Sequence, residues 1–121
     1  MATVFEGVDT RLDRVVAIKL MHEGLGDDVD FAAKFDKEAR AAARLSHPNI
    51  VAVFDQGVEG DRPYIVMEYV QGCTLRALIR REERLSPASA LSYLEPVVRA
   101  LAAAHEVGLV HCDVKPENVL I

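Results

Sequence analysis

The last residues of the chain place an acid, a base and an amide at close spacing. Residues 111–118 read His-Cys-Asp-Val-Lys-Pro-Glu-Asn. The carboxylate of Asp113 can accept a proton from an attacking hydroxyl, the ammonium of Lys115 can neutralise a transferring phosphoryl group, and the amide oxygen of Asn118 can bind a metal ion. This spacing therefore indicates phosphoryl-transfer chemistry.

A second chemical group lies in a β-branched run at residues 15–21. The run is expected to form a strand, and a period of two places Ala17 and Lys19 on the same face. A flat ring could lie against the small Ala17 while the ammonium of Lys19 reaches its phosphates. The alternative is an edge-strand lysine that only prevents aggregation.

A third group lies in the helix expected at residues 29–45. Its apolar stripe consists of Phe31, Phe35, Ala42 and Leu45. Glu38 falls at the spacing of this stripe, so it is expected to point inward, where a carboxylate requires a cation such as Lys19. In the alternative interpretation Glu38 is exposed and forms a surface pair with Lys34 or Arg40.

The elements around these groups predict an α+β fold. Further strands are expected at residues 1–8, 50–55 and 63–69, giving an antiparallel sheet with a hairpin loop through 57–62. Helices are expected at 75–81 and 88–107, the second kinked by Pro96. The flexible linker at 70–73 separates a strand-rich part from a helical part.

Composition excludes several classes of protein. The net charge of −5 argues against nucleic-acid binding, and the arginines of residues 76–84 are interrupted by Glu82 and Glu83, as in a solvated helix end. Only two cysteines are present, which favours a reduced, cytoplasmic setting. No apolar run is long enough to span a membrane, although an anchor elsewhere in a longer protein is left open.

A metal cluster of His105, His111, Cys112 and Asp113 is disfavoured because adjacent side chains cannot all point to one centre.

Taken in order, these motifs resemble the bacterial eukaryotic-like serine/threonine protein kinases over essentially the whole chain. Residues 16–19 match the Val-Ala-Ile-Lys strand, Glu38 matches the glutamate of helix C, and residues 47–50 match the His-Pro-Asn-Ile loop after it. The resemblance implies a kinase-like fold. Residues 1–70 would form the small lobe without its glycine-rich loop, and 71–121 would begin the large lobe and end with the catalytic loop.

The resemblance also implies an adenine site. Val4 and Ala17 would enclose the ring, and Met67 would guard the pocket behind it. The backbones of Glu68 and Val70 would hydrogen-bond to the edge of the ring. ATP and Mg²⁺ are therefore the implied cofactors.

For the transferred group, the resemblance implies that Lys19, paired with Glu38, contacts the α- and β-phosphates of ATP. Asp113 would be the catalytic base, Lys115 the phosphate stabiliser and Asn118 a magnesium ligand. A lysine two residues after the aspartate favours serine and threonine hydroxyls of protein substrates over tyrosine. The contact between Lys19 and Glu38 is the feature on which the enzymatic interpretation depends most.

Three departures from the family pattern lead to further expectations. The chain lacks the glycine-rich loop and ends at Ile121 before any Asp-Phe-Gly, so it is expected to be inactive in isolation. Cys112 stands where most members have arginine, which predicts less dependence on activation-loop phosphorylation. The long helix lacks later partners, which predicts self-association.

Two alternatives to a protein kinase remain. One is a pseudokinase or scaffold that binds nucleotide without transferring phosphate. The other is a small-molecule phosphotransferase on a related fold, which the Lys115-Pro116 pair disfavours. An Asp-Phe-Gly directly after Ile121 would favour the enzyme over the scaffold.

Overall fold

The structure, a computed structural model, describes residues 2–121. Met1, the first residue of the strand expected at 1–8, lies outside the described residues. The chain forms two compact units. The first runs to Ser46 and resumes at Val51–Tyr69, and the second comprises His47–Ile50 and Val70–Ile121.

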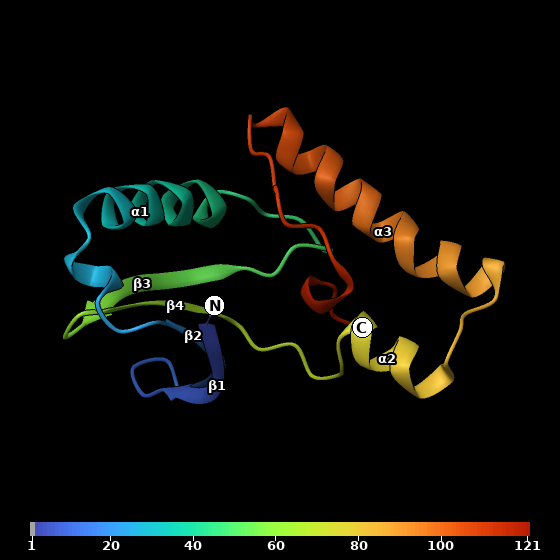
Figure 1. The fold of residues 1–121 in the computed structure, drawn as a ribbon, viewed down its shortest axis with the longest axis horizontal. Helices are drawn as coiled ribbons and strands as arrows, with labels where there is room; N and C mark the ends of the chain where they lie inside the picture. Colours follow the sequence, from blue (N-terminus) through green and yellow to red (C-terminus); the bar gives the residue numbers. More distant parts are fainter. Residues whose placement is uncertain (1) are drawn as a thin grey trace. The chain divides into compact units, whose positions relative to one another are not determined.

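The first unit is built on a four-stranded sheet. Its strands are β1 (Ala2–Asp9), β2 (Arg14–Met21), β3 (Val53–Glu59) and β4 (Arg62–Glu68). They lie in the order β1-β2-β4-β3, and every neighbouring pair is antiparallel (Figure 1). The antiparallel sheet predicted from the sequence is therefore confirmed.

The β3–β4 hairpin is longer than the sequence suggested. The strand expected at 50–55 begins at Val53 and continues to Glu59, so residues expected in the loop belong to the sheet. The sequence predicts Gly57 at the start of the hairpin loop. It is needed in the strand, since a Cβ there would lie 2.6 Å from the hydroxyl of Tyr64. The actual turn contains Gly60 with φ of 63°.

A short 3₁₀ turn, η1 (Leu25–Asp27), leads into helix α1 (Val29–Ala43). The Asp28 carboxylate caps α1 by accepting from the amide of Phe31 at 3.1 Å, which satisfies a free N–H of the first turn. On the inner face the rings of Phe31 and Phe35 stack with centroids 5.8 Å apart. Ala39 is 4% exposed, and α1 packs along β3 (Figure 1).

The second unit contains α2 (Leu75–Glu82), α3 (Pro87–Glu106) and the 3₁₀ turn η2 (Pro116–Asn118). The hydroxyls of Thr74 and Ser86 cap α2 and α3. The apolar stripe of α3 is exposed at Leu91, Leu94 and Val98, and self-association of the chain stays a prediction. Within residues 2–121, no helix is long and apolar enough to cross a bilayer.

Candidate active site

The loop after α3 is fastened to the start of α2 by main-chain hydrogen bonds. Cys73 and Ile121 exchange two of them, at 3.1 and 2.8 Å, and the amide of Leu75 donates to the carbonyl of Val119 at 2.8 Å. This pairing fixes the end of the loop that follows Asn118. The first turn of α2 therefore serves as the support on which the loop is built.

Gly72 makes this close pairing sterically feasible. Its φ is 150°, a value that side chains disfavour, and a Cβ at this position would overlap the carbonyl oxygen of Ile121. Gly72→Ala is expected to weaken the pairing by more than about 1 kcal/mol, speeding amide exchange at Leu75 and Ile121 by at least about fivefold. Gly108→Ala is the matched control, because Gly108 also has a positive φ of 80° but has open space around it. Equal acceleration by both variants would contradict this steric role.

The three chemical groups predicted in the loop lie together. Lys115 Nζ is 2.8 Å from Asp113 Oδ2. Asn118 Nδ2 donates to the main-chain oxygen of Asp113 at 2.8 Å and to its Oδ2 at 3.2 Å. The amide of Asp113 donates to His111 Nδ1 at 3.1 Å. Short-range contacts within one loop thus hold a carboxylate, an ammonium and an amide around one point.

The charges in this cluster stabilise each other. The hydrogen bond from Lys115 lowers the pKa of Asp113 below its ordinary value of 3.8, and Asn118 lowers it further. The same contact with Asp113 raises the pKa of Lys115 above 10.5. At neutral pH Asp113 is therefore an ionised acceptor and Lys115 a full cation, as proton acceptance and phosphate neutralisation require.

The orientation of Asn118 suits a metal ligand. Its Nδ2 donates to Asp113, so Oδ1 faces elsewhere and keeps its lone pairs for a hard cation such as Mg²⁺. Among residues 2–121, no group of three or more His, Cys, Asp and Glu side chains could hold a metal ion. Because Oδ1 of Asn118 is left for a cation, this residue fits one position in the coordination shell of Mg²⁺.

One ion pair that supports the loop was missed from the sequence. Arg76 Nε on α2 lies 2.8 Å from Glu117 Oε1 on η2, and this contact lowers the pKa of Glu117. The two residues are 41 positions apart, so no local pattern links them. The sequence predicts Arg76 in a solvated helix end, whereas it binds the turn that carries Asn118.

In the first unit, strand register places four predicted nucleotide contacts on one face of the sheet. Val4 on β1 is directly opposite Lys19 on β2, and Ala17 on β2 is directly opposite Met67 on β4. Directly opposed residues of antiparallel strands point to the same side, as do Ala17 and Lys19. Ala17 is buried, with 9% of its surface exposed.

Of the two residues predicted to contact the adenine edge, Glu68 is the last residue of β4 and Val70 lies beyond the strand. The amide of Glu68 donates to the carbonyl of Ala52 at 2.8 Å, and its carboxylate accepts from the amide of Ala52 at 3.1 Å. The N–H of Glu68 is therefore already used within the sheet and cannot donate to a ligand. Val70 belongs to the second unit.

The prediction that Glu38 points inward is wrong. Its side chain is 67% exposed and pairs with Lys34 at 3.8 Å, which is the alternative that the sequence left open. No ion pair joins Glu38 to Lys19 within residues 2–121. The buried face of α1 runs through Phe35 and Ala39, and Glu38 lies about 100° around the helix from Ala39.

A contact with the neighbouring strand accompanies this orientation of α1. Gln56 Nε2 on β3 donates to Asp36 Oδ1 at 2.7 Å. In the sheet, Gln56 is directly opposite Ile65 of β4. Ile65 in turn is directly opposite Lys19 of β2, so all three side chains lie on one face. Asp36 therefore meets the sheet on the face that carries Lys19. Because Asp36 and Glu38 are about 200° apart on a helix, anchoring Asp36 to the sheet turns Glu38 away from it.

Comparisons with known proteins agree with this arrangement of motifs. A family described as the protein kinase domain matches residues 1–121. The serine/threonine-protein kinase PknL of Mycobacterium tuberculosis is 49% identical over 120 residues, which cover 99% of this chain and 30% of PknL. PrkC of Bacillus subtilis, also a serine/threonine-protein kinase, is 46% identical over 121 residues, 100% of this chain and 19% of PrkC. The crystal structure of a mutant kinase domain of M. tuberculosis PknI has a TM-score of 0.87 and 32% identity, over 99% of this chain and 49% of that one.

Proposed function

This chain belongs to the protein kinase domain family, and from that premise we propose that the protein containing it transfers the γ-phosphoryl group of ATP to serine and threonine hydroxyls of proteins. The observation that carries the proposal is the cluster in which Asp113 lies within hydrogen-bonding distance of both Lys115 and Asn118. The chain spans 30% of PknL and 19% of PrkC. The activity is therefore proposed for the whole protein, and the isolated chain is expected to be inactive.

Each member of the cluster has one role in this proposal. Asp113 accepts the proton of the attacking hydroxyl, and its lowered pKa keeps it ionised for that purpose. Lys115 moves from Asp113 to the transferring phosphoryl group and offsets its charge. Asn118 would hold Mg²⁺ through Oδ1. Mg²⁺, when bound, neutralises the charge of the phosphate oxygens.

The sheet face of the first unit supports nucleotide binding. Val4 and Ala17 would hold the adenine ring, with Met67 behind it, and Lys19 would contact the α- and β-phosphates. The remaining adenine contacts would come from the carbonyl of Glu68 and the backbone of Val70. Glu38 would join Lys19 only after α1 turns, since it now pairs with Lys34.

We also propose that residues 1–70 and 71–121 correspond to the small lobe and the start of the large lobe.

A further proposal about regulation rests on Cys112. It is exposed, with φ of 63° and its thiol 3.6 Å from the carbonyl of Val110, and it offers no cation to an activation-loop phosphate. The protein is therefore expected to depend less on such phosphorylation than family members that have arginine at this position.

An assay of phosphate transfer tests the proposed function. The full-length protein, incubated with γ-labelled ATP, Mg²⁺ and a library of serine- and threonine-containing peptides, should label those peptides. Chelation of Mg²⁺ should abolish the labelling. Nucleotide binding without transfer under all conditions would contradict the proposal and favour the pseudokinase alternative.

The charge coupling within the loop gives a prediction about pH. Lys115→Met removes the cation that stabilises ionised Asp113, so the pKa of Asp113 is expected to rise toward 3.8. In the wild type, the stabilisation of the loop by this pair is complete above the ordinary pKa and is lost as the pH falls through the lowered value. NMR titration of the Asp113 carboxyl carbon measures this pKa. Arg99→Met is the control, because Arg99 pairs with Glu95 on α3, and a pKa unchanged by Lys115→Met would contradict the coupling.

A further inference from the structure

The side chain of Arg76 reaches from α2 to the turn that carries Asn118. Its Nε donates to Glu117 Oε1 at 2.8 Å. Among the hydrogen bonds of residues 2–121, this is the only one that joins α2 to η2. Glu117 directly precedes Asn118 in the chain, so the ion pair restrains the backbone immediately before the residue whose Oδ1 is left for a cation.

The backbone around Asn118 is held to α2 on both sides. On the C-terminal side, the amide of Leu75 donates to the carbonyl of Val119 at 2.8 Å. On the N-terminal side, the amide of Asn118 donates to the carbonyl of Lys115 at 2.9 Å, which closes η2 but does not attach it to α2. Arg76 supplies that attachment. Without it, only the segment that follows Asn118 would stay fixed to the helix.

Helix α2 is a firm support for this contact. Leu75 and Leu78 are 6% and 7% exposed, and the hydroxyl of Thr74 caps the helix by accepting from the amide of Ala77 at 3.1 Å. A side chain on a packed, capped helix holds its partner more precisely than one on a loop. Arg76 lies in this first turn, so the position of Glu117 is set by the packing of α2.

The direction of the Asn118 side chain depends on this backbone. Its Nδ2 donates to the main-chain oxygen of Asp113 at 2.8 Å and to Oδ2 of the same residue at 3.2 Å. A rotation of η2 would change both distances and turn Oδ1 with them. Mg²⁺ requires near-ideal octahedral geometry, so even a small rotation would weaken its binding.

The exposure of the pair fits a positioning role better than a role in stability. The side chains of Arg76 and Glu117 are 39% and 47% exposed, and ion pairs of this exposure contribute little to the stability of a fold. Contacts that orient a metal ligand matter more, since their loss typically weakens metal binding by roughly 10- to 100-fold. Removing this pair should therefore leave the chain folded and change the metal site.

We propose that Arg76 is a positioning residue, which holds Glu117 and thereby fixes the direction in which Asn118 presents Oδ1 to Mg²⁺. The role in metal binding rests on the proposed function, whereas the restraint on Asn118 does not require nucleotide or metal. Loss of the pair is expected to weaken metal binding and to loosen the Asn118 side chain, without changing the affinity for peptide substrates.

The first test measures Mn²⁺ binding to the full-length protein by electron paramagnetic resonance, with ADP present and Mn²⁺ as the probe for the Mg²⁺ site. Arg76→Met is expected to weaken Mn²⁺ binding by about tenfold. Arg76→Lys should restore part of this loss, because a single donor makes the contact. Glu117→Gln should act like Arg76→Met, and the double variant should lose little more, since one interaction is removed in all three.

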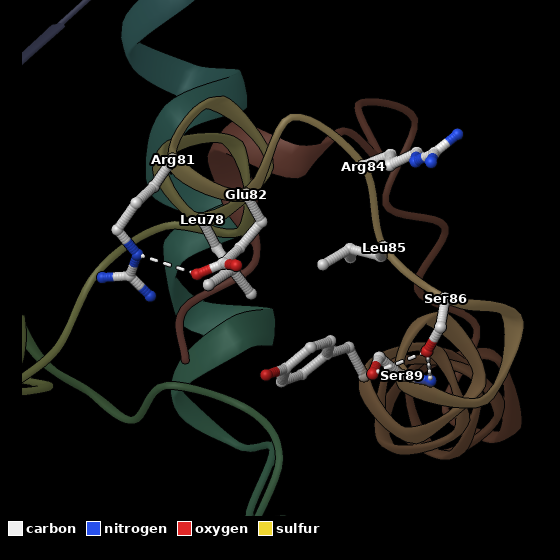
Figure 2. A pocket seen from close by; sticks show the side chains of 8 residues that line it. Leu78, Arg81, Glu82, Arg84, Leu85, Ser86 and Ser89 are labelled. Atoms are coloured by element: carbon white, nitrogen blue, oxygen red, sulfur yellow. Dashed lines mark hydrogen bonds and ion pairs between the residues drawn. The ribbon is translucent and has the colours of Figure 1, made fainter.

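The matched control is Arg81→Met. Arg81 also lies on α2, but it pairs with Glu82 of the same helix at 3.2 Å (Figure 2). Its removal should leave Mn²⁺ binding unchanged. An equal loss in Arg81→Met and Arg76→Met, or losses that multiply in the double variant of Arg76 and Glu117, would overturn the proposal.

The second test needs neither nucleotide nor metal. NMR measures the exchange of the Asn118 side-chain amide protons with water, which should be severalfold faster in Arg76→Met and unchanged in Arg81→Met. Faster exchange in a protein whose wild type transfers no phosphate would contradict the proposed function and support the restraint by Arg76. Phosphate transfer by the wild type, with Mn²⁺ affinity or Asn118 exchange unchanged in Arg76→Met, would overturn the positioning role alone.

Discussion

Replacing Asp113 with asparagine is expected to lower the phosphoryl-transfer rate of the full-length protein by about a thousandfold. The substitution keeps the size of the side chain but removes the only carboxylate of the Asp113, Lys115 and Asn118 cluster. The bond from Asn118 to the main-chain oxygen of residue 113 remains, so the loop should keep its conformation. The loss should therefore appear in kcat, while nucleotide affinity changes little.

Single-turnover kinetics and nucleotide titration measure these two quantities for Asp113→Asn. The matched control is Asp27→Asn, which alters an exposed carboxylate in η1. A rate for Asp113→Asn within about threefold of the wild type would contradict general-base catalysis by this residue. Equal losses in both variants would show that the effect is not specific to the loop.

The sequence predicted the parts of the fold that depend on local pattern. Strand β2, helices α2 and α3 and the antiparallel sheet agree with the elements that the sequence predicts. The resemblance to bacterial serine/threonine protein kinases is confirmed by the family match and the relatives. The extent of β3 could not be predicted, because Gly57 lies in the strand to admit the side chain of Tyr64, a contact made by tertiary structure.

In the candidate site, too, a local sequence pattern predicted some of the contacts and not others. Asp113, Lys115 and Asn118 are close in sequence, and their clustering follows from one short loop. The pair of Arg76 and Glu117 joins distant residues and had no local signal. The orientation of Glu38 was mispredicted because the apolar stripe did not show that the buried face of α1 includes Ala39, about 100° around the helix from Glu38.

The orientation of Glu38 therefore needs a functional test of its own. The family match rests on the whole chain, so the missing contact with Lys19 does not remove the kinase assignment. Under the proposed function, in which Lys19 and Glu38 must meet for transfer, phosphate would be transferred in another conformation of α1. The contacts that would have to break are the exposed pair of Glu38 with Lys34 at 3.8 Å and the bond of Asp36 to Gln56 at 2.7 Å.

If Lys19 and Glu38 act as a pair in the transfer step, Lys19→Met and Glu38→Gln should each lower kcat/KM of the full-length protein by about a hundredfold or more. The double variant should then lose little beyond either single change, because one interaction is removed in all three. Lys34→Met is the control: it removes the partner that holds Glu38 at the surface, so the rate should stay equal or rise. Phosphoryl-transfer kinetics of the four variants measure this coupling. Losses that multiply in the double variant, or a full loss in Lys34→Met, would show that Glu38 acts from its exposed position rather than through Lys19.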